Sequence, residues 1–547
     1  MKKVILLLGL VVFGHVLAAQ TDKGYLTGSL ESNSYYYMDD KKTGAFIGDT
    51  DPFATANYLK LDYYKGRFSA GMQLEGHLPA VLDLRPYLHG FNLGNIYATW
   101  QDDDFSVTAG TFYEQFGSGL LFRSWEDRAL GLNNAVIGAR FTYNYKDIVS
   151  FKALWGLPRL GMGIFTSNVQ RELYPTNKDT QVRGADVSFA ISNLVGWTDL
   201  YLAIEASGLN RYEPDLSPDY VELGGKSSTF GWSGRLNFEC SGFFAKAEYV
   251  DAGNKYHSDG AGEYFIKKGN AQLIDFGYNG KGLGVTVTGR RLEWMRSEIL
   301  TGNNSPLNMM NYVPALCTQY TYMLTNLHPY SSQVGEYLGG FMNSGEIGGQ
   351  IDAFYNFRRG TALGGKRGMK IHANFSTYYT IDEEGTYKAG ALVFRDFSFD
   401  IEKQWNKKFK TMLLYSHQEY NSSKPAGSLN EMINQDIFVL DMLYKYTDRF
   451  STRLELQYLL TKDDDKDWMA ALLEVNFAPR WSLFVSDMFN HGSTKVHYYN
   501  AGVSYTKSRT RLALGYGRFK GGFICSGGVC REISPYTGAN LTLTTSF

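Results

Sequence analysis

The chain has 547 residues, a formal net charge of −1 and 15% aromatic residues, with 59 Gly but only 13 Pro. Balanced charge gives no electrostatic reason to expect a nucleic-acid partner, and four Cys in this length exclude a scaffold built on disulfides. The abundance of Tyr, Phe and Gly favours many strands joined by turns.

The first 19 residues have the pattern of a secretory signal peptide. Lys2 and Lys3 precede an apolar run, and the small residues Ala18 and Ala19 follow it. We therefore expect an exported protein in which residues 20–547 form a single domain. No later apolar run approaches the roughly 20 residues of a membrane helix, which excludes a helical membrane protein.

Segments in which apolar and polar residues alternate recur along the rest of the chain. In residues 57–64, Leu59 and Leu61 share one face while Lys60 and Asp62 share the other. A tight turn follows and residues 68–75 continue the alternation, which predicts a β-hairpin. Similar segments lie at residues 149–155, 232–239, 283–288, 370–375, 396–402 and 453–458.

Residues 111–131 (TFYEQFGSGLLFRSWEDRALG) interrupt the alternation. Strand-like residues precede and follow them, so we expect an insert between two strands. Gly117 and Gly119 provide the backbone freedom to fold this insert back on itself. The charged residues that we take as candidates for a functional site are Glu114, Arg123, Glu126, Asp127 and Arg128 in this insert and Arg140 on the polar face of the next strand.

The connections between predicted strands fall into two classes. Short ones include residues 65–66, 102–104, 146–147 and 478–480, whereas long polar ones include residues 39–52, 78–90, 158–181 and 291–344. The two classes largely alternate, as expected for strands that cross a membrane between a short-turn side and a long-loop side. We predict an all-β fold, a transmembrane antiparallel up-and-down β-barrel of about 24 strands (roughly 22–26), with short periplasmic turns and long extracellular loops.

The end of the chain supports this prediction over the alternative, a secreted propeller or solenoid. Residues 536–547 (YTGANLTLTTSF) alternate and end on Phe547. They resemble the C-terminal strand by which bacterial outer-membrane barrels are recognised for insertion.

Three motifs carry a resemblance to a known family: EQFGSGLLFRSWEDRALG, NYVPALC and CSGGVCR. With them the mature chain resembles a family of functionally uncharacterised outer-membrane proteins of Bacteroidota. The resemblance implies a barrel in the bacterial cell outer membrane, in contact with its lipid. It also suggests two classes of protein partner, an outer-membrane lipoprotein and the secretion or assembly machinery.

Candidate chemistry is sparse. Cys525 and Cys530 are separated by four residues that include Gly527 and Gly528, so the chain can reverse and a disulfide is expected, with a metal pair as the alternative. Apart from the loose pair His491 and His497, the His residues show no metal-ligand spacing, and they are interpreted as polar loop residues. The acidic runs lack the pattern of a calcium loop, and no GxSxG occurs. We expect no enzymatic activity, no cofactor and no metal.

Two functions remain open at this level. The first is a porin-like channel or transporter for small hydrophilic solutes, in which the charged insert folds into the lumen and narrows it, with Arg123 and Arg128 facing Glu114, Glu126 or Asp127. The second is a structural or accessory barrel subunit of a secretion or assembly complex. A solvated surface loop is the alternative for the insert, and residues 291–344 are either a plug or a surface loop.

Overall fold

The computed structural model of the chain describes residues 24–48, 50–84, 88, 90–159, 180–214, 218–258, 264–297, 309–332, 336–338, 341–421 and 432–547. The expected signal peptide, residues 1–19, lies outside the described residues, as does most of the connection 158–181.

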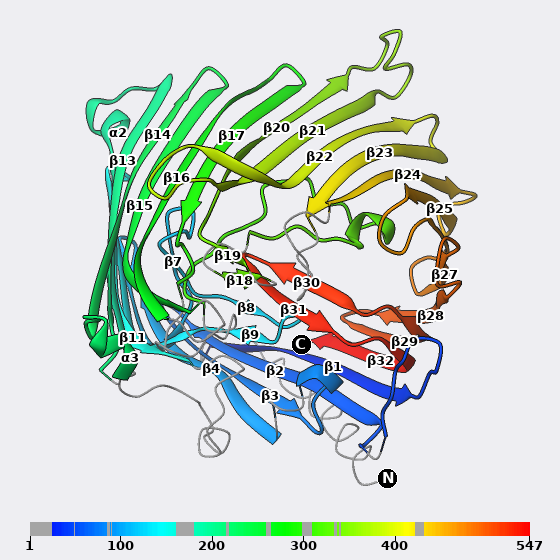
Figure 1. The fold of residues 1–547 in the computed structure, drawn as a ribbon, viewed down its shortest axis with the longest axis horizontal. Coiled ribbons are helices and arrows are strands. Elements are labelled where there is room, and N and C mark those ends of the chain that lie inside the picture. The colour runs from blue at the N-terminus through cyan, green and yellow to red at the C-terminus, as the bar shows by residue number, and fades with distance from the viewer. Residues whose placement is uncertain are drawn as a thin grey trace.

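The wall is one closed antiparallel sheet of 24 strands, which confirms the predicted β-barrel (Figure 1). Consecutive wall strands pair with each other, and β1 pairs with β32 to close the ring. Closure leaves no free strand edge, so each strand has a hydrogen-bonding neighbour on both sides. The wall strands are β1 (Tyr25–Met38), β2 (Phe53–Lys65), β3 (Phe68–His77), β4 (Gly90–Gln101), β5 (Phe105–Phe112), β10 (Val136–Tyr145), β11 (Val149–Pro158), β12 (Gln181–Ala190), β13 (Leu200–Tyr212), β14 (Ser228–Cys240), β15 (Phe243–Ser258), β16 (Tyr264–Gly280), β17 (Leu283–Glu293), β20 (Gly345–Phe357), β21 (Met369–Ile381), β22 (Ala389–Gln404), β23 (Phe409–Asn421), β24 (Met432–Lys445), β25 (Phe450–Thr461), β26 (Trp468–Phe477), β27 (Trp481–Asn490), β28 (His497–Lys507), β29 (Thr510–Phe519) and β32 (Tyr536–Ser546).

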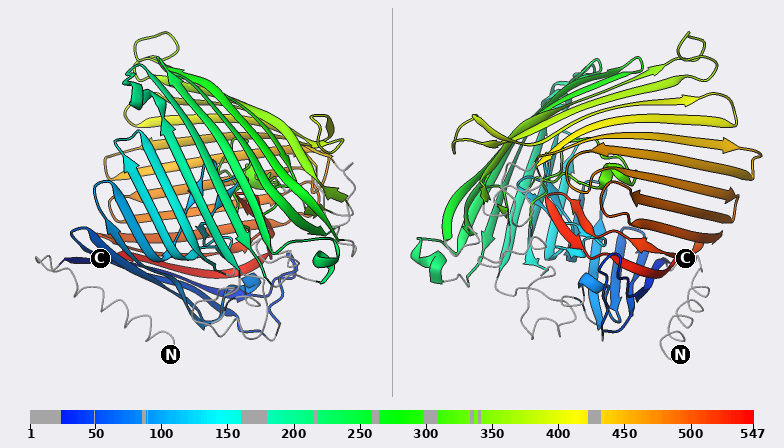
Figure 2. Two further views of the ribbon diagram at one scale, coloured as in Figure 1. Left: turned by 90° about the vertical axis from the view of Figure 1, so that its left-hand side faces the viewer. Right: turned by 45° about the vertical axis from the view of Figure 1, so that its right-hand side comes forward.

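The remaining elements are short and lie in the connections. Figure 2 shows the wall strands tilted side by side, with the smaller elements at the ends of the barrel or within it. Among the described residues, no helix has both the length and the apolar character needed to cross a membrane. These elements are η1 (Leu82–Leu84), β6 (Gln115–Phe116), β7 (Phe122–Arg123), β8 (Glu126–Asp127), β9 (Leu132–Asn133), α2 (Ile191–Val195), α3 (Pro218–Glu222), η4 (Leu324–Asn326), β18 (Glu336–Leu338), β19 (Phe341–Asn343), β30 (Gly522–Ser526) and β31 (Val529–Ile533).

The alternation of the sequence separates the two faces of the wall. On β22, Phe397 is 42% exposed on the outside, whereas its neighbours Asp396 and Ser398 are buried on the inside. Leu413 on β23 and Phe438 on β24 are exposed in the same way. The outside of the barrel is therefore rich in large apolar side chains, and much of the inside is polar.

The connections also follow the predicted asymmetry. Residues 66–67, 146–148, 241–242 and 508–509 join strands at one end, which we call the short-turn end. The connections at the opposite, long-loop end include residues 113–135, 294–344 and 520–535. Where these long connections go decides what occupies the lumen.

Candidate functional site

Three long connections fold into the barrel. They are residues 113–135 between β5 and β10 (the insert), residues 309–332 between β17 and β20 (the central segment), and the β30–β31 hairpin. We call the three together the plug. Figure 1 shows β7, β8, β9, β30 and β31 within the ring of wall strands.

Backbone hydrogen bonds join the three parts of the plug. Each of these bonds is 2.9 Å long, so the parts form one hydrogen-bonded body rather than three separate loops. The N–H groups of Arg123, Tyr312 and Val313 donate to the carbonyl oxygens of Met310, Gly119 and Gly527, respectively.

The plug has an apolar core that is shared with the wall. Phe116 and Leu121 of the insert pack with Met310 of the central segment and with inward side chains such as Val182 and Val250. Removing this surface from water stabilises the folded insert. The buried apolar side chains of the insert include Leu120, Leu121, Phe122, Trp125, Leu130 and Leu132.

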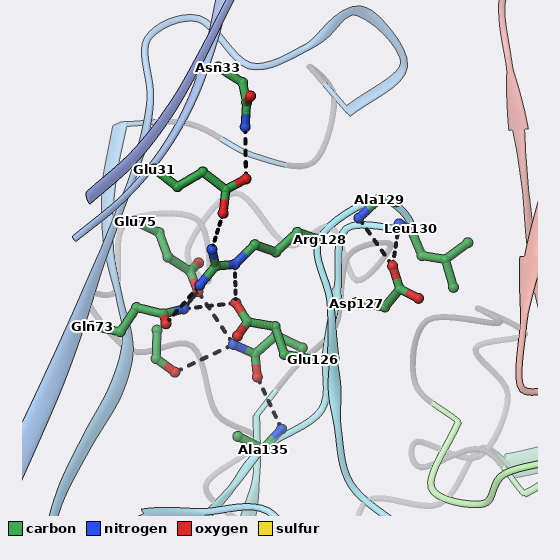
Figure 3. Close-up of polar contacts among 12 residues, drawn as sticks. Glu31, Asn33, Gln73, Glu75, Glu126, Asp127, Arg128, Ala129, Leu130 and Ala135 are labelled. Carbon is green, nitrogen blue, oxygen red and sulfur yellow. Dashed lines mark hydrogen bonds and ion pairs between the residues drawn. The ribbon is translucent and has the colours of Figure 1, made fainter. Parts of the chain in front are cut away.

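Arg128 fastens the insert to the first strands of the wall (Figure 3). Its guanidinium donates to the Glu31 carboxylate on β1 and, over 3.2 Å, to the side-chain oxygen of Gln73 on β3. Within the insert, its Nε donates to Glu126 over 3.1 Å. Burial alone would lower the pKa of Arg128, but the two carboxylates raise it, so the group stays charged.

Asp127 has a different role from its neighbour Glu126. Its Oδ1 accepts hydrogen bonds from the backbone N–H groups of Ala129 and Leu130, both at 3.1 Å (Figure 3). Asp127 therefore holds the turn between β8 and β9, whereas the expected pairing of Arg128 with an acid of the insert is made by Glu126.

Glu114 connects the insert to the next part of the wall. Its carboxylate accepts from Lys152 Nζ on β11 over 2.9 Å and lies 3.6 Å from Arg140 Nε on β10. Glu114 and Arg140, both singled out in the sequence, therefore lie together. Lys152 was missed, although it occupies a polar position of an alternating strand.

Arg123 contacts aromatic rings. Its guanidinium carbon lies 3.8 Å from the ring centre of Tyr312 and 5.5 Å from that of Trp125. Within the described part of the chain, no carboxylate is within ion-pair distance of Arg123. A cation over an aromatic face is attracted by the ring quadrupole, so Arg123 ties the insert to the central segment rather than to an acid.

The tip of the insert reaches β14 and β15. The Ser118 N–H donates to Glu248 on β15 over 3.2 Å. Gly117 has φ +54°, and a Cβ there would lie 2.6 Å from Arg235 Cδ. Both the conformation and the close approach require glycine, so Gly117 lets the insert rest on the wall.

The central segment meets the wall of β20 to β24 through hydroxyl groups. Each donates to a carboxylate on the inner face, an arrangement that the sequence analysis missed because the partners are far apart in the chain. The pairs are Thr318 with Asp352 (3.4 Å), Tyr320 with Asp400 (2.8 Å), Tyr322 with Asp441 (3.3 Å) and Ser332 with Glu346 (2.9 Å).

The hairpin completes the plug. Cys525 and Cys530 lie opposite each other across β30 and β31 and are joined through their sulfur atoms. Next to them, Val529 is buried against Trp125 and Met309. No group of three or more His, Cys, Asp and Glu side chains in the described ranges is arranged to hold a metal ion.

Comparison with known proteins gives a family and distant structural likenesses. The model of one protein family, described as a family of unknown function, matches residues 1–547. No curated protein matches the sequence.

Solved structures with a similar course of the chain include three barrels. The P pilus usher (PapC) translocation pore has a TM-score of 0.43 at 10% identity, covering 95% of this chain and 99% of that chain. The siderophore receptor PirA from Pseudomonas aeruginosa has a TM-score of 0.42 at 10% identity, with coverage of 95% and 80%. The copper transporter OprC has a TM-score of 0.38 at 8% identity, with coverage of 96% and 81%.

Proposed function

This chain belongs to DUF6029, a family of unknown function, and we propose that it is an outer-membrane transport barrel for small hydrophilic solutes whose lumen is closed at rest by its own plug. The proposal combines a location, a transport role and a closed resting state, each supported by a separate feature.

The outer face of the wall supports the location. Large apolar side chains such as Phe141, Ile204 and Leu413 are exposed on strands from different parts of the ring. So much exposed apolar surface is unfavourable in water but matches the hydrocarbon of a bilayer. A closed barrel satisfies its backbone hydrogen bonds internally, as a bilayer requires.

The observation that carries the transport role is the way the plug is held. It contacts a polar inner wall through hydrogen bonds and ion pairs, such as Arg128 with Glu31 and Tyr320 with Asp400. Such contacts can be exchanged for contacts with water or solute, and loops are known to plug wide barrels in this way. Because the plug is joined covalently to the wall only at the ends of its segments, it can move once these contacts are exchanged, while the wall stays closed.

Planar-bilayer recording tests this function. We expect the wild-type protein to conduct little, and a variant in which a Gly-Ser linker of equal length replaces residues 309–332 to show large, stable conductance steps. Replacing residues 361–367 at the short-turn end in the same way is the matched control and should leave the conductance low. If the plug replacement folds into a barrel and still does not conduct, the transport role is wrong.

The second candidate is an accessory barrel of a secretion or assembly complex. The extent of the plug favours this candidate. The central segment crosses the lumen and contacts wall strands from β17 to β25, as expected for a barrel whose role is structural and whose lumen stays filled. In this case, native membranes should yield a stoichiometric protein partner on purification, and the plug replacement should leave partner binding unchanged.

A further inference from the structure

A chain of polar and charged side chains lies on the outer face of β21 to β24. Its members are linked by consecutive contacts of 2.8–3.7 Å and belong to four neighbouring strands. We call it the outer network. In order across the wall it consists of Tyr379, Arg395, Glu419, His417, Asp436 and Tyr415.

The side chains of the outer network point away from the lumen, as the alternation of exposed and buried residues along their strands shows. Arg395 shares its face of β22 with the exposed Phe397, whereas the intervening Asp396 is buried inside. Likewise, Asp436 shares its face of β24 with the exposed Phe438. The side chain of Arg395 is 34% exposed, so its contacts with Tyr379 and Glu419 do not enclose it.

The network lies near the long-loop end. Glu419 is two residues from the end of β23, and Asp436 is four residues after the start of β24. Residues on one face of a strand are spaced by roughly 7 Å, so Arg395 and Asp436 lie one such step nearer the long-loop end than Phe397 and Phe438 on their own strands. His417 and Tyr415 are in register with Phe397 and Phe438, respectively. Charged groups are costly toward the middle of a bilayer and tolerated near its surface, which places the Arg395–Glu419 end of the network at the depth of lipid headgroups.

We propose that the outer network binds the phosphorylated sugar headgroup of an outer-leaflet glycolipid. The proposal rests on the outer-membrane location and on the long-loop end facing outward. Arg395 offers a planar set of donors suited to a phosphate, and the imidazole of His417 carries a further N–H donor. Glu419 and Asp436 can accept hydrogen bonds from sugar hydroxyls. A headgroup with both phosphate and hydroxyl groups therefore complements a network that holds a guanidinium, an imidazole and two carboxylates.

The test measures the unfolding temperature of the purified full-length protein in vesicles by its heat-dependent gel shift. Phosphatidylcholine vesicles are compared with vesicles that also contain lipopolysaccharide, dephosphorylated lipopolysaccharide or phosphatidylglycerol. We expect a rise in unfolding temperature only with phosphorylated lipopolysaccharide, and loss of this rise in the Arg395→Gln, His417→Gln double variant. An equal rise with phosphatidylglycerol would show a general phosphate contact and overturn the assignment to a glycolipid.

Two further variants separate lipid binding from structural stability. Arg453→Gln removes an Arg that pairs with Asp441 on the inner face, and it should keep the rise with lipopolysaccharide even if it lowers stability overall. Glu419→Gln breaks the network while leaving Arg395 in place. Because Glu419 is one of the two proposed sugar acceptors, we expect a smaller rise with lipopolysaccharide, measured against the same variant in phosphatidylcholine, whereas a purely structural network would lose stability equally in every lipid.

The location of the ligand is tested in native membranes with a photo-crosslinker at position 415. Labelling of lipopolysaccharide supports the proposal, and labelling of a protein overturns it. The proposal would also be overturned if lipopolysaccharide did not raise the unfolding temperature of the wild-type protein. None of these measurements depends on conductance, so they fail or succeed separately from the transport role.

Discussion

Arg290 on β17 and Glu346 on β20 form an ion pair of 2.9 Å, with side chains only 1% and 2% exposed. The central segment closes around this pair: Arg290 donates to the Pro314 carbonyl oxygen over 2.5 Å, and the hydroxyl groups of Tyr330 and Ser332 donate to Glu346. Because β17 and β20 are the strands that the central segment connects, the pair anchors the segment close to where it leaves and rejoins the wall.

We predict that Glu346→Gln releases the central segment. The change leaves the buried Arg290 charge without its carboxylate, a loss of about 3–5 kcal/mol. Planar-bilayer recording should show frequent openings, and the unfolding temperature should fall. Glu402→Gln is the matched control, because Glu402 pairs with Lys410 at 2.9 Å in an exposed position. Equal conductance of both variants and the wild type would contradict the prediction.

We predict that Arg123→Ala combined with Arg128→Ala changes conductance or ion selectivity while the barrel stays folded. The double change removes the contact with Tyr312 and the pair with Glu31, which hold the insert to the central segment and to β1. Heat-modifiable migration on gels should persist because no hydrogen bond between wall strands is lost. Arg67→Ala, which breaks an exposed pair with Asp102 near the short-turn end, serves as the control. Unchanged conductance with a protease-accessible insert would refute a constriction.

Cys317 should report on the position of the plug. Burial, and then the nearby charge of Asp396, raises the pKa of its thiol well above the ordinary value. The thiolate that reacts with alkylating reagents is therefore scarce near neutral pH. We expect slow alkylation of Cys317 in the wild type and at least tenfold faster alkylation in Glu346→Gln, with Cys240 as the internal reference. Fast labelling in the wild type would show that the plug does not bury this thiol.

We predict that Cys525 and Cys530 are disulfide-bonded in the protein isolated from cells. Mass spectrometry after non-reducing extraction should find both thiols blocked, and free thiols at both positions would disprove the bond. Replacing both residues by Ser should cost roughly 2 kcal/mol for a loop this short. We expect this loss to appear as easier opening of the plug, because Gly527 of the hairpin accepts the Val313 N–H.

Deletion of Phe547 should impair assembly of the barrel. The backbone of Phe547 makes two hydrogen bonds with Gly28, both 2.9 Å, and a Cβ at Gly28 would lie 2.4 Å from the Phe547 ring. The residue therefore secures the seam between β1 and β32. Membrane fractions should contain less heat-modifiable protein after the deletion, and Gly28→Val should have a similar effect. Ser546→Ala, which keeps the backbone contacts, is the control; normal assembly of the deletion variant would contradict this role.

The sequence by itself determined the class of fold. Alternation such as that of Leu59 and Leu61 against Lys60 and Asp62 is a local property, because successive side chains of a strand point to opposite faces. The lengths of the connections are also read directly along the chain. Together they were enough to predict an antiparallel barrel of about 24 strands and to place an insert between β5 and β10.

Only the tertiary structure decided how the lumen is filled. Arg128 meets Glu31 across 97 positions of the chain, and Asn134 meets Met309 across 175. Which residues become partners depends on which strands and connections come together in the closed ring. No local sequence pattern determines this arrangement. The apolar inner positions Val182, Val250 and Leu292 were missed for the same reason. A residue that faces the lumen is polar where it meets water and apolar where it packs against the core of the plug. The path of the plug is set by contacts between distant segments, so a local pattern does not show which inner positions are apolar.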